Sequence, residues 1–537
     1  MFADEICSAM ATAADRIDAE KATPTTKPEL ESKSILAGPS SKNDDEVNNT
    51  ARSISLLQRL EKTLLKYNIE SRGIQRVEDH EKQKHTPFVY AQVFFLFLSI
   101  NLVVNNVTLG MLGPAVYELS FTDASLCATF GSLAGSIPTA WIATWGPLSG
   151  IRTMIFGRYT MGWWPSKLIV ILNIVQMLGY SLVVSIIGGQ VLSAVSPHGS
   201  MSVVVGIIII VIIVWLVTTF GIAVFHYYER FAWIPQLVVL SILYGVSAKY
   251  FDLSYVSVGD TRTVAGNRLS FFSICLAAAI TYAPLSMDYF VYWSSATSRI
   301  GIFVATLTGL WISFTFALVL GIGIASGIFS NATLESAWSN EQGGSGSGAL
   351  LVAAYADIGS FGKFCAVIVA LGGIANMIPP TYSSGVDFQI LGKHFAKVPR
   401  VVWNTIGVII YVACALGGRN NLAVIFTNFL ALMGYWVAIW IAIVLEEFMF
   451  FRGRSTKNYD WNQWDNRRKL PLGAAALVAF LVGWAGAVLC MAQIYYIGPI
   501  AKLVGEYGAD MGNYVGFSWA ALVYPPLRWF EKKKFGR

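Results

Sequence analysis

Charged residues are scarce in this sequence. Only 13% of its 537 residues are Asp, Glu, Lys or Arg, while 55% are hydrophobic. A water-soluble globular domain carries roughly 25% charged residues, so the composition excludes that class. The net charge of +6 does not indicate nucleic-acid binding, because the basic residues collect between apolar stretches and in the tails, as membrane orientation requires. The sequence predicts an all-α polytopic membrane protein that contacts the lipid bilayer and has no nucleic-acid partner.

Cysteine pairs and catalytic motifs are also missing. The six cysteines lie far apart, with neither a CxxC pattern nor a Cys/His spacing, which argues against a metal site and a disulfide framework. No HExxH, P-loop, GxSxG or paired-carboxylate pattern occurs in a suitable context. We therefore expect no enzyme activity, no bound metal and no cofactor.

Residues 1–86 have no apolar run long enough to cross a membrane. Residues 1 to about 50 are rich in Ser, Thr, Ala, Lys, Asp and Asn, and such a segment cannot bury enough apolar area to fold. We expect a disordered cytosolic tail with a short amphipathic helix at 54–70, where Leu57, Leu60 and Leu64 follow helical spacing. A charged-then-apolar leader with a cleavage site is missing, so no removable signal peptide is expected.

Apolar windows of about 20 residues, the length of a helix that crosses a bilayer, recur along residues 87–526. Twelve such windows lie at 88–112, 124–147, 167–195, 201–223, 232–250, 270–293, 301–328, 362–391, 400–417, 421–445, 471–495 and 511–526. An even number places both termini on one side. Lys and Arg are more frequent in the connections on that side, which predicts that both termini are cytosolic. Residues 527–537 are predicted to be a basic cytosolic tail.

The first span carries amides where lipid would not tolerate them. Asn101, Asn105 and Thr108 recur at i, i+4 and i+7, which on one helix forms a polar stripe, and glycines with Pro114 loosen the backbone just beyond. A polar stripe on a spanning helix points inward and predicts a binding site near the middle of the bilayer. The alternative is that the amides pair with neighbouring helices, which for Asn106 is equally plausible.

The sixth span is interrupted in a similar way. Pro284 lies in the middle of this segment, two residues after Tyr282. The first and sixth spans correspond in two five-helix halves, and broken helices at corresponding positions indicate a transport site built on inverted repeats. The Tyr282 ring next to the break is suited to stacking on a flat ligand ring.

Charges within the spans are few. Asp288, just beyond Pro284, is a candidate for proton coupling, because a carboxylate in a broken helix can bind a proton when desolvated and release it when hydrated. The alternative is a structural pair with a basic or hydroxyl neighbour. Glu446 and Glu447 end the tenth span beside the sequence FRGR, and we interpret them as a solvated cluster at the membrane interface.

The eighth span carries the strongest amide outside the first span. Asn376 lies three residues before the pair Pro379 and Pro380. An Asn side chain offers one donor group and one acceptor, which suits recognition of ring N–H and C=O groups. The alternative is that Asn376 caps a kinked helix.

With these residues in view, the chain from about residue 60 onward resembles the fungal purine-cytosine permeases of the nucleobase-cation symporter group. The resemblance rests on long motifs that occur in order: ESRGIQRV (70–77), GPLSGIRTMIFGRYTMGWWPSKL (146–168), GGQ (188–190), GKFC (362–365), IANMIP (374–379), NFLALMGYW (428–436), IGPIAKLVGEYGAD (497–510), YPPLRW (524–529) and KKFGR (533–537). It implies a twelve-helix, leucine-transporter-like fold with a 5+5 inverted repeat plus two extra helices. It also implies proton-coupled uptake of nucleobases across the plasma membrane.

The resemblance also implies a substrate site. Its members would be Ser99, Asn101, Tyr282, Asn376, Pro379, Val184 and Pro380. Val184 and Pro380 depart from the family, because polar side chains are usual at these two positions. When a buried polar group of the ligand loses its hydrogen-bond partner, the binding free energy becomes roughly 1–3 kcal/mol less favourable.

These departures leave three functions to weigh. The first is proton-coupled symport of a nucleobase (cytosine or a purine) or a similar small planar heterocycle. The second is transport of vitamin B6 (pyridoxine), which the same family includes, and the third is a non-transporting sensor on the same scaffold. The expected partner is a small heterocyclic substrate, and the sequence leaves open whether the chain forms a homodimer.

Overall fold

The computed structural model describes residues 73–83, 88–196, 200–220, 222–339 and 346–537. The amphipathic helix expected at 54–70, and the tail that precedes it, lie outside these residues.

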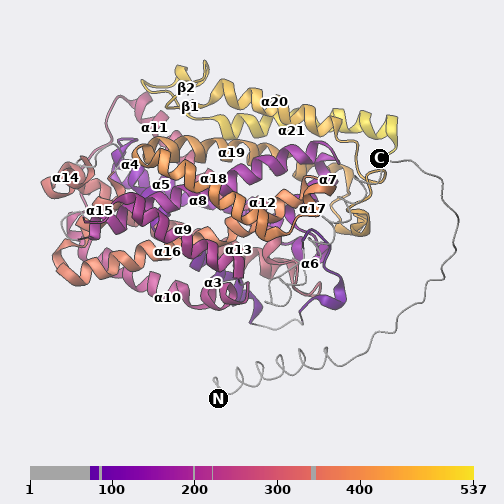
Figure 1. Ribbon diagram of the computed structural model, residues 1–537. Helices are drawn as coiled ribbons and strands as arrows, with labels where there is room; N and C mark the ends of the chain where they lie inside the picture. The colour runs from indigo at the N-terminus through magenta and orange to yellow at the C-terminus, as the bar shows by residue number, and fades with distance from the viewer. Residues whose placement is uncertain (1–72, 84–87, 197–199, 221, 340–345) are drawn as a thin grey trace, which may run out of the picture. The chain divides into compact units, whose positions relative to one another are not determined.

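The described residues are almost entirely helical (Figure 1). The α-helices are α3 (Val89–Asn101), α4 (Val104–Ala115), α5 (Phe121–Ala143), α6 (Gly146–Ser149), α7 (Thr153–Met161), α8 (Pro165–Val195), α9 (Val203–Phe220), α10 (Ile222–Ser247), α11 (Thr261–Ile280), α12 (Ala283–Ser286), α13 (Arg299–Ser326), α14 (Ala332–Ser339), α15 (Ser347–Ala354), α16 (Gly359–Ile390), α17 (Lys393–Ala396), α18 (Arg400–Gly418), α19 (Leu422–Glu446), α20 (Ala474–Cys490) and α21 (Gly512–Phe535). Two short helices matter below, the 3-10 helix η4 (Met287–Tyr289) and the π-helix η8 (Glu447–Phe451). Strands β1 (Ala492–Gln493) and β2 (Tyr496–Ile497) form one antiparallel hairpin.

Within the described residues, eight helical segments are long and apolar enough to cross a membrane. The bent pair α3 and α4 makes a ninth if it counts as one span. The segments 203–219 and 474–490 are apolar but shorter. The number of spans shown is therefore eight or nine, and the twelve expected from the sequence remain a prediction.

The first span breaks earlier than the sequence suggested. α3 ends at Asn101, Val103 is extended with φ −139° and ψ 157°, and α4 starts at Val104 with a bend of 60°. The break therefore does not lie at the glycines and Pro114, which α4 includes. Asn101 and Asn105 lie on different helices, so the predicted stripe does not exist as one helical face.

Side-chain amides satisfy the backbone at this break. Asn106 Nδ2 donates to the carbonyl oxygen of Asn101 at 2.8 Å. Asn101 Nδ2 in turn donates to the carbonyl oxygen of Phe97 at 2.9 Å. Carbonyls in the last turn of a helix lack partners within that helix, and an unpaired one would be costly in a water-poor interior. Asn106 therefore satisfies a free carbonyl at the break, whereas Asn101 adds a second donor to Phe97, which precedes the last four residues of α3.

Glycines let α4 and α13 cross at very short distance. A Cβ added to Gly321 on α13 would lie 1.9 Å from the carbonyl oxygen of Val107, and one added to Gly110 on α4 would lie 2.1 Å from that of Leu318. Both obstacles are backbone atoms, which cannot rotate away. The two backbones touch, as they do where small residues line helix contacts in membranes.

We predict that Gly321→Ala destabilises the protein by about 1–3 kcal/mol, the usual cost of overpacking, because α13 must move away from α4. Melting of the purified protein in detergent measures this effect. Gly245→Ala on α10 is the matched control, since an added Cβ there meets nothing within 4 Å. Equal melting temperatures for the two variants would contradict the close crossing.

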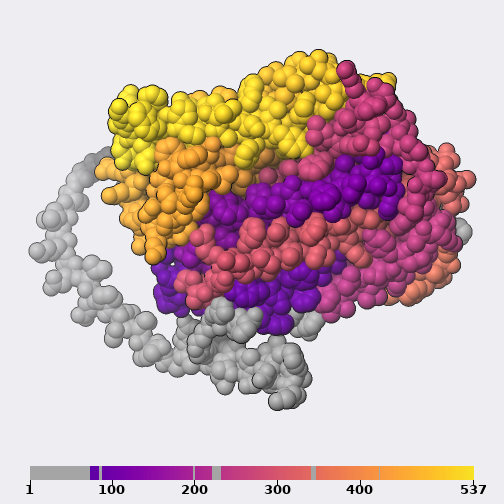
Figure 2. All heavy atoms as spheres, turned by 180° about the vertical axis from the view of Figure 1, so that it is seen from behind, coloured from indigo at the N-terminus to yellow at the C-terminus, as the bar shows by residue number. Residues whose placement is uncertain are grey.

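The C-terminal helices α20 and α21 pack along each other and against α19 (Figures 1 and 2). α21 continues to Phe535, so residues 527–535 form the end of this helix, where the sequence suggested a tail. Arg528 is only 2% exposed and lies beside Glu447, which is fully buried. The expected solvated cluster at Glu447 is thus wrong, because the last turns of α21 cover this carboxylate.

Candidate functional site

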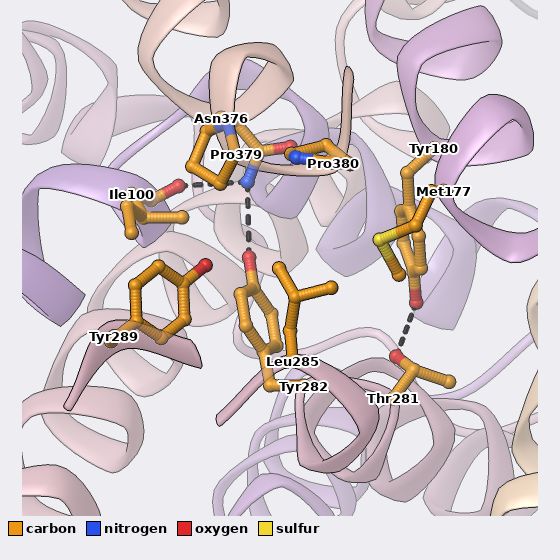
Figure 3. Close-up of a pocket in the computed structure, with 10 residues that line it drawn as sticks. All are labelled: Ile100, Met177, Tyr180, Thr281, Tyr282, Leu285, Tyr289, Asn376, Pro379 and Pro380. Atoms are coloured by element: carbon orange, nitrogen blue, oxygen red, sulfur yellow. Dashed lines mark hydrogen bonds between the residues drawn. The ribbon is translucent and has the colours of Figure 1, made fainter. Parts of the chain in front are cut away.

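One buried amide joins three helical segments. Asn376 on α16 donates from Nδ2 to the carbonyl oxygen of Ile100 at 2.8 Å and to the hydroxyl of Tyr282 at 3.0 Å (Figure 3). Ile100 lies in the last turn of α3, where the break frees its carbonyl, and Tyr282 lies between α11 and α12. Both interrupted helices expected from the sequence therefore meet at the eighth predicted span.

A cavity lies beside this junction. Its volume is about 30 Å³, and the residues that line it are Ile100, Met177, Tyr180, Thr281, Tyr282, Leu285, Tyr289, Asn376, Pro379 and Pro380 (Figure 3). A ring-sized ligand needs considerably more room, since ligand pockets span about 300–1,000 Å³. Binding of a ring therefore requires lining side chains or whole helices to move.

Tyr180 is a lining residue that sequence reasoning missed. It lies on α8, and its hydroxyl shares a hydrogen bond of 2.5 Å with Thr281 Oγ1. Gln176, one turn earlier, donates from Nε2 to the carbonyl oxygen of Thr281 at 2.8 Å, so α8 holds the interruption after α11 from two points. The spacing in the sequence could have indicated this residue. Tyr180 precedes the candidate Val184 by four residues, which places both on the same face of a helix.

A second small space lies on the other side of the two tyrosines. Its volume is about 10 Å³, enough for about one water molecule. Asn105 and Asn106 line it, together with Tyr180 and Tyr282, which also line the larger cavity. Tyr180 and Tyr282 are thus shared by the linings of both spaces.

The first-span candidates lie near the cavity without lining it. Ser99 is fully buried, and its Oγ has no hydrogen-bond partner among the described residues. Asn101 is also fully buried and bonds to Phe97 and Asn106 at the helix break. In this conformation Asn101 supports the backbone at the break, whereas Ser99 contributes no hydrogen bond to it.

Of the remaining candidates, Pro379 and Pro380 line the cavity and Val184 does not. Val184 is 1% exposed, and its Cγ1 lies 2.9 Å from the point that a Cβ on Gly373 would occupy. This valine therefore fills the contact between α8 and α16.

Asp288 lies in η4, beyond the cavity. Its Oδ1 accepts hydrogen bonds from the backbone nitrogen of Thr153 at 2.7 Å and from Thr153 Oγ1 at 3.0 Å. Its Oδ2 lies 3.5 Å from a guanidinium nitrogen of Arg152. The structural pair considered as the alternative is present, and a role for Asp288 in coupling remains a prediction.

The described part of the chain contains no group of three or more His, Cys, Asp or Glu residues arranged to hold a metal ion. The site instead offers an amide, three tyrosines, a threonine and apolar walls. Such groups bind and orient a ligand by stacking and hydrogen bonding.

Comparison with known proteins places the chain among membrane transporters. A family model described as a permease for cytosine/purines, uracil, thiamine and allantoin matches residues 77–505. The vitamin B6 transporter TPN1 of Saccharomyces cerevisiae is 34% identical, over 87% of this chain and 88% of that protein. The purine-cytosine permease fcyB of Emericella nidulans is 35% identical, over 90% of this chain and 93% of that protein.

Solved structures show the same fold. Mhp1, a nucleobase-cation-symport-1 family transporter in a closed conformation with bromovinylhydantoin bound, superimposes with a TM-score of 0.64 at 15% identity. The match covers 87% of this chain and 96% of that one. An inward-facing conformation of Mhp1 gives a TM-score of 0.59. The chain is thus an all-helical polytopic membrane protein with the leucine-transporter-like fold of Mhp1, and it belongs to the purine-cytosine permease family of nucleobase-cation symporters, which are transporters and not enzymes.

Proposed function

We propose that this protein is a secondary active transporter that moves a small planar nitrogen heterocycle together with a proton across the plasma membrane. A nucleobase, cytosine or a purine, is the first candidate substrate. The observation that carries the proposal is the single amide of Asn376, which holds the broken first span and Tyr282 against one cavity. In this proposal the chain has twelve spans, in a 5+5 inverted repeat plus two helices, with both termini cytosolic.

The lining groups suit a flat ring with polar edges. Asn376 Oδ1 accepts no hydrogen bond from any described residue, so it is free to accept from a ring N–H. The Tyr180 and Tyr282 rings supply faces or edges for the flat surface of a ligand. Proline and leucine side chains exclude water from the remaining sides, which strengthens each polar contact.

Vitamin B6 is the second candidate, and the apolar side chain of Pro380 in the cavity lining favours it. Polar partners for a purine or cytosine edge are fewer than the family usually provides. The cavity nevertheless keeps hydroxyl groups at Tyr180, Thr281 and Tyr289. Hydroxyls can donate to and accept from the hydroxyl groups of pyridoxine.

The experiment that tests this function is uptake in cells that lack their own carriers. We expect accumulation of one labelled compound among cytosine, adenine, hypoxanthine and pyridoxine, with more accumulation at acidic external pH. Competition by the unlabelled compounds then ranks the substrates. Cells that carry the empty vector are the control. Normal surface expression without accumulation of any compound would contradict transport and favour a sensor.

A further inference from the structure

A second buried carboxylate lies near the pair of Asp288 and Arg152. Asp387 on α16 is only 3% exposed. Its one hydrogen bond from a described residue comes from Asn173 Nδ2 on α8, at 2.7 Å. No described residue forms an ion pair with Asp387, whereas Asp288 has Arg152 as well as two hydrogen bonds from Thr153.

These groups face one another across a boundary between helices. Arg152 precedes α7, and its guanidinium carbon lies 5.8 Å from the ring centre of Tyr382 on α16. Tyr382 precedes Asp387 by five residues on α16, so the pair of Arg152 and Asp288 packs against the part of α16 that carries Asp387. Asp288 and Arg152 therefore lie on the side formed by α7 and η4. Asp387 lies on the side formed by α16 and α8.

Other cations around this end of α16 are engaged elsewhere. Arg400 on α18 stacks on the ring of Tyr382, with its guanidinium carbon 4.0 Å from the ring centre. Lys167 on α8 donates from Nζ to the carbonyl oxygen of Ile390. Neither forms an ion pair with Asp387. With both carboxylates ionised, the group of Arg152, Asp288 and Asp387 carries a net charge of −1 in a largely buried place, which is unfavourable.

We propose that Asp387 is the carboxylate that binds the coupling proton, an assignment that rests on the proposed function. A proton on Asp387 neutralises the three-residue group when α16 packs against α7 and η4. When these segments separate, water hydrates the site, and the ionised carboxylate becomes favourable again. The proton is then released to this water. This proposal assigns the coupling proton to Asp387, a carboxylate without its own cation, in place of Asp288, the residue suggested by the sequence.

The test is Asp387→Asn in the full-length protein, with the best substrate of the uptake panel. The amide imitates the protonated acid and cannot release a proton. We expect exchange of labelled for unlabelled substrate at a rate within about threefold of wild type. Accumulation against a gradient and stimulation by external acid should be lost. Asp357→Asn, at the surface pair with Lys249, is the matched control and should behave as wild type.

Asn173→Ala provides a second readout that keeps Asp387 in place. The Asn173 amide stabilises the ionised carboxylate by donating to it, so its loss favours the protonated form. The external pH at which uptake is half-maximal should therefore rise. This pH profile tests the assignment of Asp387 even if the Asp387→Asn protein does not reach the membrane.

The outcomes separate this proposal from the proposed function. A wild-type protein that accumulates no heterocycle in response to a pH gradient would refute proton-coupled transport itself. Wild-type accumulation that persists in Asp387→Asn, or an unchanged pH profile in Asn173→Ala, would overturn only the assignment of Asp387. Loss of exchange in Asp387→Asn at normal surface level would also overturn it, because the residue would then be structural.

Discussion

Asn376→Ala should abolish measurable high-affinity uptake while the protein still reaches the membrane. The substitution removes the donor that binds the carbonyl oxygen of Ile100 and the hydroxyl of Tyr282. It also removes the oxygen proposed to bind the substrate. Each buried polar group left without a partner costs about 1–3 kcal/mol, and one such loss in binding weakens the affinity roughly 5- to 150-fold. The initial rate of uptake against substrate concentration measures the effect.

A matched control separates the site from general loss of a buried amide. Asn404 on α18 is fully buried and donates from Nδ2 to Thr218 Oγ1 at 2.9 Å, away from the residues that line the cavity. Asn404→Ala should lower the free energy of unfolding by an amount similar to Asn376→Ala, and it should leave the substrate competition profile unchanged. Normal uptake by Asn376→Ala would remove Asn376 from the binding site. Equal loss of uptake in both variants would indicate damage to folding.

Arg528→Ala should cause the largest loss of stability, about 3–5 kcal/mol, because it removes the ion pair of the buried Glu531 and leaves Glu447 with Arg452 alone. Arg528 Nε lies 3.0 Å from one carboxylate oxygen of Glu447, and its NH1 lies 2.6 Å from Glu531. Tyr524 also donates to Glu447 at 2.8 Å. The melting temperature in detergent and the amount of protein at the membrane report the loss.

Two further variants test whether charge is the cause. Lys532→Ala changes an exposed cation in the next helical turn of α21, and it should leave the melting temperature within error. Adding Glu447→Gln to Arg528→Ala removes one of the stranded charges and should recover part of the lost stability. An Arg528→Ala protein as stable as wild type would show that the buried network contributes nothing to holding α21 on α19.

The positions of most helices followed from hydropathy. The windows 167–195 and 362–391 match α8 (Pro165–Val195) and α16 (Gly359–Ile390) within a few residues. Apolar length decides this, because a helix that crosses lipid must pair all its backbone groups internally. Hydropathy could not locate the end of α21, since residues 527–535 are polar and basic and their burial depends on what they pack against.

The site was predicted in part. The junction of the first span, Tyr282 and the region around Asn376 was expected from breaks in corresponding helices and from the resemblance. The position of the first break was not, because the turn at Leu102 and Val103 contains no glycine or proline. The carbonyl of Ile100 just before this turn is instead held by Asn376 on α16, a contact 276 residues away in sequence.

The sequence alone determined the class of protein, the approximate helices and the family, because apolar length and ordered motifs are local properties of the chain. Only the tertiary structure decided which polar groups share a space. It placed Tyr180 opposite Tyr282, paired Asp288 with Arg152 and left Asp387 with a single amide. Burial and pairing of a polar group depend on neighbours from distant helices, and no local pattern carries that information.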